Sequence, residues 1–439
     1  MTFYNILDYG AKDGDLCTSA IQSAFDAAQE DSATVLIPAG VFSTGTINMR
    51  GASLRLEKGA VLKGSGYFKD YEETGYSHNE MGSVRSLLYS IDNSDITIDG
   101  EGAIDLNGDS FYDFANRAIP ESKVPFSEKQ IAECTATYEN RPNQPIFFLR
   151  CKHVKLQSIS ISNAPSWTLS FVECTDVRVL DLSIDNNLSI PNCDGMHFSC
   201  STDIQVRGCR ISAGDDCIAF TCVTDWLKPC ERAVVSDCIL KSCSKAISIG
   251  YMHSIVRDIA VSNCVIYESN RAIALMSSAG TGLVENVLLG NLRLDTRIRA
   301  GNWWGNGEPV CLMGTYHNYD RYRDSPPARS YDACIRNVII QNIICTGENA
   351  IAIIGENGSV EGVLIDHVSF SRKDSENLPL KGNIIDLSPG SQTAIMPESM
   401  NYWLFLKQVK SVKVTNARVP KFHGQKLGVY CEGCEDAVY

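Results

Sequence analysis

Three aspartates near the middle of the chain combine a residue type and a spacing that could perform acid–base chemistry. Asp194 lies in "NCDG", and the adjacent pair Asp215 and Asp216 lies in "AGDD". Carboxyl groups held close together shift one another's pKa, so that one can stay protonated while another is ionised. Hydrolysis of a glycosidic bond needs this division, because one carboxyl protonates the leaving oxygen and another activates water. The pattern therefore indicates a site for carboxylate-based hydrolysis.

Short strand-like runs recur along the chain and would have to position these aspartates. Each run alternates apolar with polar residues, is rich in Val and Ile, and ends in Asn, Asp, Ser or Gly. Equivalent apolar positions are Ile161, Ile184, Ile211, Leu240, Ile266, Leu294, Ile344 and Phe370. Their steps are 23, 27, 29, 26, 28, 50 and 26 residues, without helical spacing. Such a period predicts one solenoid turn per repeat, and hence a right-handed parallel β-helix.

The repeat predicts a single β-helix domain over residues 1–439 with covered ends. In the N-terminal cap region, an amphipathic helix is expected to begin after Thr18 or Ser19 as N-cap. Its apolar face comprises Ile21, Ala24, Phe25 and Ala28. Four segments depart from the repeat: the cap region 1–50, the long loops 106–145 and 300–333, and the C-terminal end region 375–439.

Coil spacing predicts which residues of the site meet. Residues one coil apart lie about 4.8 Å apart along the axis of a β-helix. Steps of 22, 29, 26 and 26 residues would therefore form one column of Asp194, Asp216, Lys245, Arg271 and Arg297. A structural ladder of ion pairs is the alternative to a catalytic column.

The same residues carry a family resemblance. "NCDG" followed one coil later by "AGDD" resembles the Asn-x-Asp-Gly and Gly-Asp-Asp motifs of glycoside hydrolase family 28, the polygalacturonases and their relatives. The segments "YGAKDGD", "AIQSAFDAA", "VLIPAGVF" and "RPNQPIFFLRC" are also similar to these enzymes. The resemblance implies a glycosidase acting on a pectic or related polysaccharide by inversion. It implies that Asp215 is the acid and that Asp194 and Asp216 activate water.

Two departures from the family pattern concern the substrate. Lys245, in "SKA", stands where the family has the His of Gly-His-Gly, and "ALM" at residues 274–276 stands where it has Arg-Ile-Lys. The usual clamp for a galacturonate carboxylate is therefore missing. An acid group could be held in another way, or the sugar could be neutral. The basic residues expected to bind substrate are Lys245, Arg271 and Arg297, with Arg299 beside them.

Further substrate-binding candidates are His197, Trp303, Trp304 and Glu308. His197 follows Asp194 by three residues, and a structural role is its alternative. The two tryptophans suit stacking on sugar faces, or else pack the loop onto the coil. Glu308 is a sugar ligand, an alternative acid or a solvated loop residue. His253 could replace the family histidine.

Composition narrows the partners. A net charge of −13 argues against nucleic acid, and no apolar run approaches the roughly 20 residues of a membrane span. We expect a carbohydrate substrate and neither a cofactor nor a bound metal ion. Most of the 18 cysteines fall in apolar runs, so they are expected to be buried free thiols. The chain start has no secretion signal, which predicts a cytoplasmic protein, or a secreted one whose signal has been removed.

Two other functions stay open. A polysaccharide lyase on the same fold would hold Ca²⁺ with the three aspartates and use Lys245 or Arg271 as base. A non-catalytic carbohydrate-binding β-helix would have kept the motif without the activity.

Overall fold

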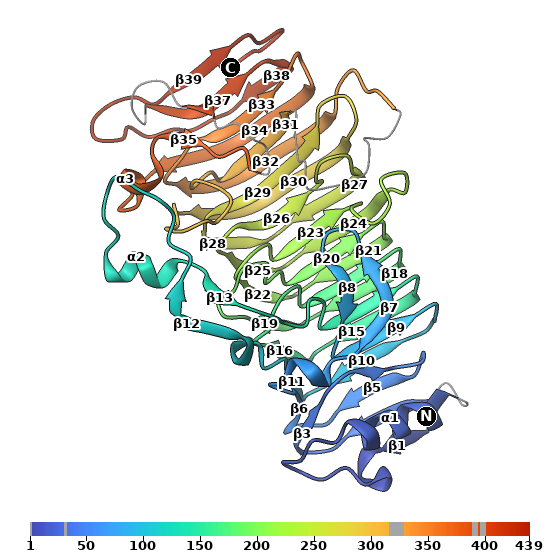
Figure 1. The fold of residues 1–439 in the computed structure, drawn as a ribbon. Coiled ribbons are helices and arrows are strands. Elements are labelled where there is room, and N and C mark those ends of the chain that lie inside the picture. Colours follow the sequence, from blue (N-terminus) through green and yellow to red (C-terminus); the bar gives the residue numbers. More distant parts are fainter. Residues whose placement is uncertain (1, 30–32, 316–328, 389–393, 396–400) are drawn as a thin grey trace.

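The strands coil into a right-handed parallel β-helix, which confirms the expected fold class (Figure 1). The structure is a computed structural model that describes residues 2–29, 33–315, 329–388, 394–395 and 401–439. Part of the expected loop 300–333, residues 316–328, lies outside the described residues. Within the described ranges, no helix is long and apolar enough to cross a membrane.

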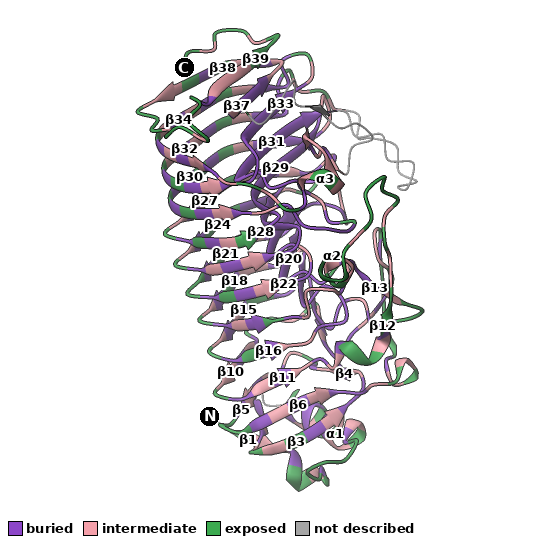
Figure 2. Ribbon diagram, turned by 90° about the vertical axis from the view of Figure 1, so that its left-hand side faces the viewer, coloured by how far each residue is buried: buried purple, intermediate pink, exposed green. Residues whose placement is uncertain are grey.

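One parallel sheet of twelve strands runs along the helix and carries the aspartate motifs. In its central strands, between residues 146 and 355, every residue is buried, whereas the strands at both ends are partly exposed (Figure 2). Its strands are β4 (Ile47–Asn48), β9 (Leu88–Ile91), β14 (Ile146–Leu149), β17 (Leu169–Val172), β20 (Met196–Ser199), β23 (Ile218–Thr221), β26 (Lys245–Ile249), β29 (Arg271–Ser278), β31 (Val310–Thr315), β33 (Ile351–Gly355), β37 (Tyr402–Lys407) and β39 (Gly428–Glu432).

A second parallel sheet of 21 strands forms the rest of the coil wall. Its short strands stack in two rows, which merge in the long strands β30, β32 and β34. Its strands are β1 (Phe3–Asn5), β2 (Thr34–Ile37), β3 (Gly40–Thr44), β5 (Ser53–Leu56), β6 (Ala60–Gly64), β10 (Thr97–Gly100), β11 (Ala103–Asp105), β15 (Lys152–Gln157), β16 (Ser160–Ser162), β18 (Thr175–Leu180), β19 (Ser183–Asp185), β21 (Thr202–Arg207), β22 (Arg210–Ala213), β24 (Cys230–Ser236), β25 (Ile239–Ser242), β27 (Ile255–Ser262), β28 (Val265–Ser269), β30 (Leu283–Thr296), β32 (Ile335–Gly347), β34 (Val360–Arg372) and β38 (Val409–Thr415).

The predicted register holds over five coils and fails at one position. Ile161, Ile184, Ile211, Leu240, Ile266 and Leu294 pair in succession, as the repeat predicted. The partner of Leu294 is Cys345, however, so the choice of Ile344 was wrong by one residue. Ile344 points outward and is 59% exposed, because side chains alternate between the two faces of a strand.

Asparagines with a left-handed backbone conformation recur on successive coils and stack in their own ladder. Asn263, Asn291 and Asn342 all have positive φ, a conformation that Asn tolerates better than most residues. The Asn291 amide donates to Asn263 Oδ1 at 3.3 Å, and the Asn342 amide donates to Asn291 Oδ1 at 3.2 Å. Repetition of this asparagine thus links one coil to the next.

Stacked apolar side chains fill the core. The rings of Phe148, Phe171, Phe198 and Phe220 lie in one column, with successive centroids 5.3, 5.0 and 5.4 Å apart. Sixteen of the eighteen cysteines are also buried and all are free thiols, as predicted. Three of them, Cys209, Cys238 and Cys264, occupy equivalent positions on successive coils.

The expected N-terminal helix is α1 (Thr18–Gln29), at the N-terminal end of the coil (Figure 1). It buries the predicted apolar face of Ile21, Ala24, Phe25 and Ala28. Thr18 is its first helical residue, so neither Thr18 nor Ser19 is the N-cap. The Thr18 hydroxyl instead accepts a hydrogen bond from the Gly45 backbone N–H at 2.9 Å, which ties the helix to the coil.

Several segments leave the coil. The expected loop 106–145 contains η3 (Gly108–Phe111), α2 (Glu128–Glu133) and the antiparallel strands β12 (Tyr112–Arg117) and β13 (Ala136–Tyr138). The sequence did not reveal an antiparallel hairpin of β7 (Glu73–His78) and β8 (Gly82–Arg85). The remaining elements are η1 (Ile6–Tyr9), η2 (Phe68–Asp70), α3 (Leu378–Lys381) and the pair β35 (Ile384–Ile385) and β36 (Ala394–Ile395).

Candidate active site

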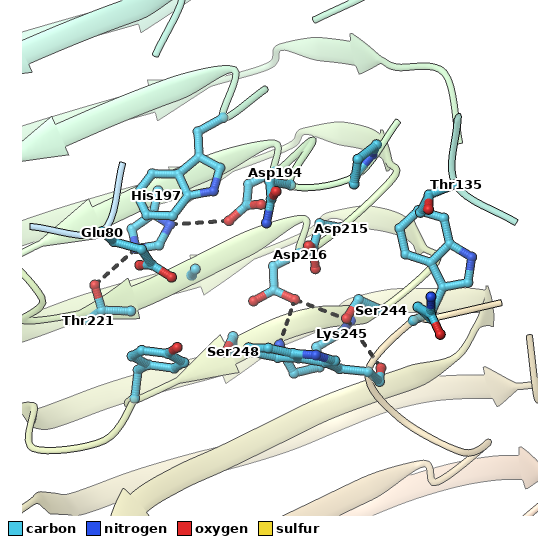
Figure 3. A pocket seen from close by; sticks show the side chains of 18 residues that line it. Glu80, Thr135, Asp194, His197, Asp215, Asp216, Thr221, Ser244, Lys245 and Ser248 are labelled. Atoms are coloured by element: carbon cyan, nitrogen blue, oxygen red, sulfur yellow. Dashed lines mark hydrogen bonds and ion pairs between the residues drawn. The ribbon is translucent and has the colours of Figure 1, made fainter. Parts of the chain in front are cut away.

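A cavity of about 260 Å³ lies on the outer face of the twelve-stranded sheet. Asp194, Asp215 and Asp216 line it together (Figure 3). The 22-residue separation of Asp194 and Asp216 thus becomes adjacency on neighbouring coils. His197, Lys245, Trp303 and Trp304 also line the cavity, whereas Arg271, Arg297 and Glu308 do not.

Strand register shows which residues share the column. Met196, Ile218, Ile247, Ile273 and Val310 pair in succession across β20, β23, β26, β29 and β31. The residues two positions before them therefore align, and they are Asp194, Asp216, Lys245, Arg271 and Glu308. The prediction of Arg297 as the fifth member was wrong. The loop before β31 lengthens the last step to 37 residues and brings Glu308 to that position.

Close backbone packing explains the glycines of both motifs. A Cβ on Gly195 would lie 2.6 Å from the carbonyl oxygen of Cys217, and one on Gly214 would lie 2.3 Å from that of Ile190. Larger residues would push the coils apart at the points where the aspartates are held. Asp194 and Asp216 are 4% and 7% exposed, whereas Asp215 is more open.

Burial and mutual repulsion change the acidity of the aspartates. Desolvation raises the pKa of Asp194 well above its usual range, and the charges of Asp215 and Asp216 add to the effect. Desolvation raises the pKa of Asp216 to about 7, although Lys245 opposes the rise. Protonated and ionised carboxyls can therefore coexist in this cavity near neutral pH.

Lys245 joins the aspartates to the aromatic wall. Its Nζ lies 3.1 Å from Asp216 Oδ1, and its backbone N–H donates to the same oxygen at 3.3 Å (Figure 3). The ammonium also lies 4.5 Å from the centre of the Trp304 ring, which stacks at 6.3 Å on Tyr251. Lys245 is only 2% exposed, so its charge is largely committed to these two neighbours.

His197 is held on both sides of its ring. Nδ1 lies 3.1 Å from Asp194 Oδ2, and Nε2 lies 2.9 Å from the Thr221 hydroxyl (Figure 3). Its ring stacks on Trp167 with centroids 3.7 Å apart. Burial lowers the pKa of His197 well below its usual range, so the neutral imidazole orients Asp194.

Arg271 and Glu308, both expected to bind substrate, face one another inside the protein. Both are 0% exposed, and Arg271 Nε donates to Glu308 Oε2 at 3.1 Å. Arg271 also donates to the Asp386 carbonyl at 2.7 Å. Glu308 accepts from the backbone N–H groups of Asn306 and Asp386. This pair holds the loop that carries Trp304 in place. At these two positions the column is therefore a structural ion pair, which was the alternative to a catalytic column.

The remaining candidates have structural contacts. Arg297 donates to Glu133 of α2 at 2.5 Å, away from the cavity. Trp303 is 4% exposed and donates from Nε1 to the Glu133 carbonyl at 2.9 Å, although it also lines the cavity. Arg299 donates to the Glu268 carbonyl, and His253 binds Thr281, both outside the cavity.

Other lining residues were not identified from the sequence. Glu80 reaches the cavity from the β7–β8 hairpin and Thr135 from the segment before β13 (Figure 3). Trp167 occupies the column one coil before Asp194, so extending the coil spacing backwards would have found it. No periodicity connects Glu80 to this site. Among the described residues, no group of three or more His, Cys, Asp or Glu has an arrangement that could hold a metal ion.

Comparisons with known proteins agree with this fold. The family model described as Glycosyl hydrolases family 28 matches residues 28–378. The family 28 exopolygalacturonase of Yersinia enterocolitica has the same fold, with a TM-score of 0.70 at 18% identity over 99% of this chain and 78% of that chain. For the exopolygalacturonase of Thermotoga maritima, the TM-score is 0.66 at 18% identity over 85% and 88% of the two chains.

A curated relative matches over a shorter stretch. An exopolygalacturonase of Platanus acerifolia is 22% identical over 231 residues, which are 49% of this chain. The chain spans about half of that relative, 52% of its length.

Proposed function

Because this chain belongs to glycosyl hydrolase family 28 and is a glycosidase, we propose that it cleaves O-glycosidic bonds of a pectic or related poly- or oligosaccharide with inversion. The observation that carries the proposal is the convergence of Asp194, Asp215 and Asp216 in one cavity. A plant relative is named an exopolygalacturonase, which supports a pectic substrate.

The three aspartates would divide the work. Asp215, the most open of them, protonates the leaving oxygen. Asp216, in its ionised form, activates the attacking water. The Lys245 ammonium favours that ionised form. Asp194, oriented by His197, helps to hold that water. One water is consumed, the glycosidic bond breaks, and the new reducing end has the opposite anomeric configuration.

A substrate screen followed by NMR tests the proposal. Pectic, rhamnogalacturonan and neutral oligosaccharides would be incubated with and without chelator, and both reducing ends and ultraviolet absorbance would be read. We expect new reducing ends, no absorbance from unsaturated products and no effect of chelator. Proton NMR of the first turnovers should show the inverted anomer. Unsaturated products that disappear with chelator would instead identify a lyase, and binding without cleavage would identify a carbohydrate-binding protein.

Removing the charge of Lys245 should move the pH dependence of the reaction. Asp216 has to be ionised, so its pKa of about 7 predicts that kcat/KM falls as the pH drops below neutrality. Lys245 lowers that pKa, and an opposite charge at this distance contributes about 1–3 pH units. In Lys245→Met, the acid limb of the kcat/KM profile should therefore shift upward by about one unit or more.

Lys241→Met is the matched control. It removes the same charge outside the cavity, where Lys241 pairs with Glu268 at 2.5 Å. Its acid limb should stay where it is in the unsubstituted enzyme. If the acid limb of the kcat/KM profile of Lys245→Met also stays in place, or moves to lower pH, Asp216 is not the ionised base.

A further inference from the structure

Acidic side chains outnumber basic ones around the cavity. Glu80, Asp194, Asp215 and Asp216 contribute four carboxyls, and among the described residues that line it Lys245 is the only lysine or arginine. From this imbalance we infer that the glycosyl unit held beside the three aspartates is a neutral sugar, a hexose or deoxyhexose, and not a uronic acid. The inference rests on the proposed function and names its substrate class.

Lys245 already has partners for its charge. Its Nζ lies 3.1 Å from Asp216 and 4.5 Å from the Trp304 ring centre, and the side chain is 2% exposed. A uronate carboxylate would have to compete with Asp216 for this ammonium. If the uronate carboxylate displaced Asp216, the Asp216 carboxylate would stay buried without its counter-charge, which is unfavourable in free energy.

Two other basic residues that the sequence predicted to bind substrate are also engaged. Arg271 is 0% exposed and is bound to Glu308 and to the Asp386 carbonyl. Arg297 is paired with Glu133 at 2.5 Å and does not line the cavity. Neither guanidinium can form the bidentate contacts with a sugar carboxylate for which Arg is suited.

The rest of the wall suits hydroxyl groups and apolar sugar faces. It offers the hydroxyls of Thr135, Thr221, Ser248 and Tyr251, amides such as that of Asn302, and indole rings. A uronate carboxylate would bring a further negative charge to this wall. At about 7 Å and an effective dielectric constant of about 20, one such repulsion weakens binding by about tenfold or more.

A pair of polymers that differ only in charge tests the inference. Polygalacturonate and carboxyl-reduced polygalacturonate share backbone and linkages, but reduction turns each carboxylate into a primary alcohol. We expect kcat/KM, from new reducing ends, to be at least about tenfold higher on the reduced polymer. Equal or faster cleavage of polygalacturonate would overturn the inference while leaving the proposed hydrolysis intact.

Binding separates the two proposals if neither polymer is cut. Titration of the enzyme with galactose and galacturonate, and with glucose and glucuronate, compares a neutral sugar with its own acid. Tighter binding of the neutral member supports the inference even where the hydrolytic function has failed. Tighter binding of either uronate overturns it.

Glu80 provides a variant that tests the electrostatic cause. Among the described residues that line the cavity, Glu80 is the one carboxyl outside the three aspartates, so Glu80→Gln should narrow the preference for the reduced polymer by about five- to tenfold. Glu101→Gln, an exposed position outside the cavity, is the control and should keep the full preference. An unchanged ratio in Glu80→Gln would overturn repulsion as the origin of the preference.

Discussion

Replacing Asp215 with asparagine is expected to lower kcat by about 10³-fold, with little change in thermal stability. An amide of the same shape cannot deliver a proton to the leaving oxygen. Asp215 is also more open than Asp194 and Asp216, so the substitution does not leave a buried group without its partner. The measurement is kcat on the best substrate of the screen, with circular dichroism melting to show that the variant folds.

The leaving group distinguishes an acid from a base. A glycosyl fluoride needs little protonation of its leaving group, so Asp215→Asn should keep most of its activity on the fluoride of the accepted sugar. Asp216→Asn should stay inactive on it, because the water is still not activated. The reverse result would exchange the two roles. Asp185→Asn, an exposed aspartate of β19, is the control and should behave like the unsubstituted enzyme on both substrates.

Loss of the buried charge on Glu308 should give the largest effect on stability. Glu308→Gln leaves the fully buried guanidinium of Arg271 without its paired carboxylate and weakens the acceptor for two backbone N–H groups. Breaking a buried pair from one side costs about 3–5 kcal/mol in free energy of unfolding. Urea unfolding at constant pH measures the loss.

An exposed ion pair supplies the comparison. Glu285 accepts from Arg336 at 2.8 Å, and the Arg336 side chain is 40% exposed. Glu285→Gln should therefore cost less than about 1 kcal/mol. The double change Arg271→Met with Glu308→Leu should recover much of the lost stability, because an apolar pair carries no desolvation penalty. A cost below about 1 kcal/mol for Glu308→Gln would contradict this role of the pair.

Periodicity made much of the fold predictable from the sequence. Each coil repeats the same alternation, so the solenoid, its register from Ile161 to Leu294 and the meeting of Asp194 with Asp216 all follow from spacing. The error at Ile344 arose where three apolar residues, Ile343, Ile344 and Cys345, follow one another. Alternation alone does not tell which of them points inward.

Contacts made by non-repeating segments could not be predicted in this way. The hairpin that brings Glu80 to the cavity begins more than a hundred residues before Asp194, and its position depends on packing. Because the loop before β31 is long, Glu308 and not Arg297 follows Arg271 in the column. Counting steps of 26 residues therefore predicted Arg271 correctly as the fourth member of the column, but predicted the fifth member incorrectly.

The buried cysteines can report the order in which parts of the protein unfold. In the folded chain only Cys431 is exposed and Cys434 partly so, whereas the other sixteen are distributed along the coil from Cys17 to Cys345. A thiol-specific reagent added during gentle denaturation would mark each coil at the moment it opens. Mass spectrometry of the labelled peptides would then show whether the solenoid frays from its ends or opens first beneath the cavity.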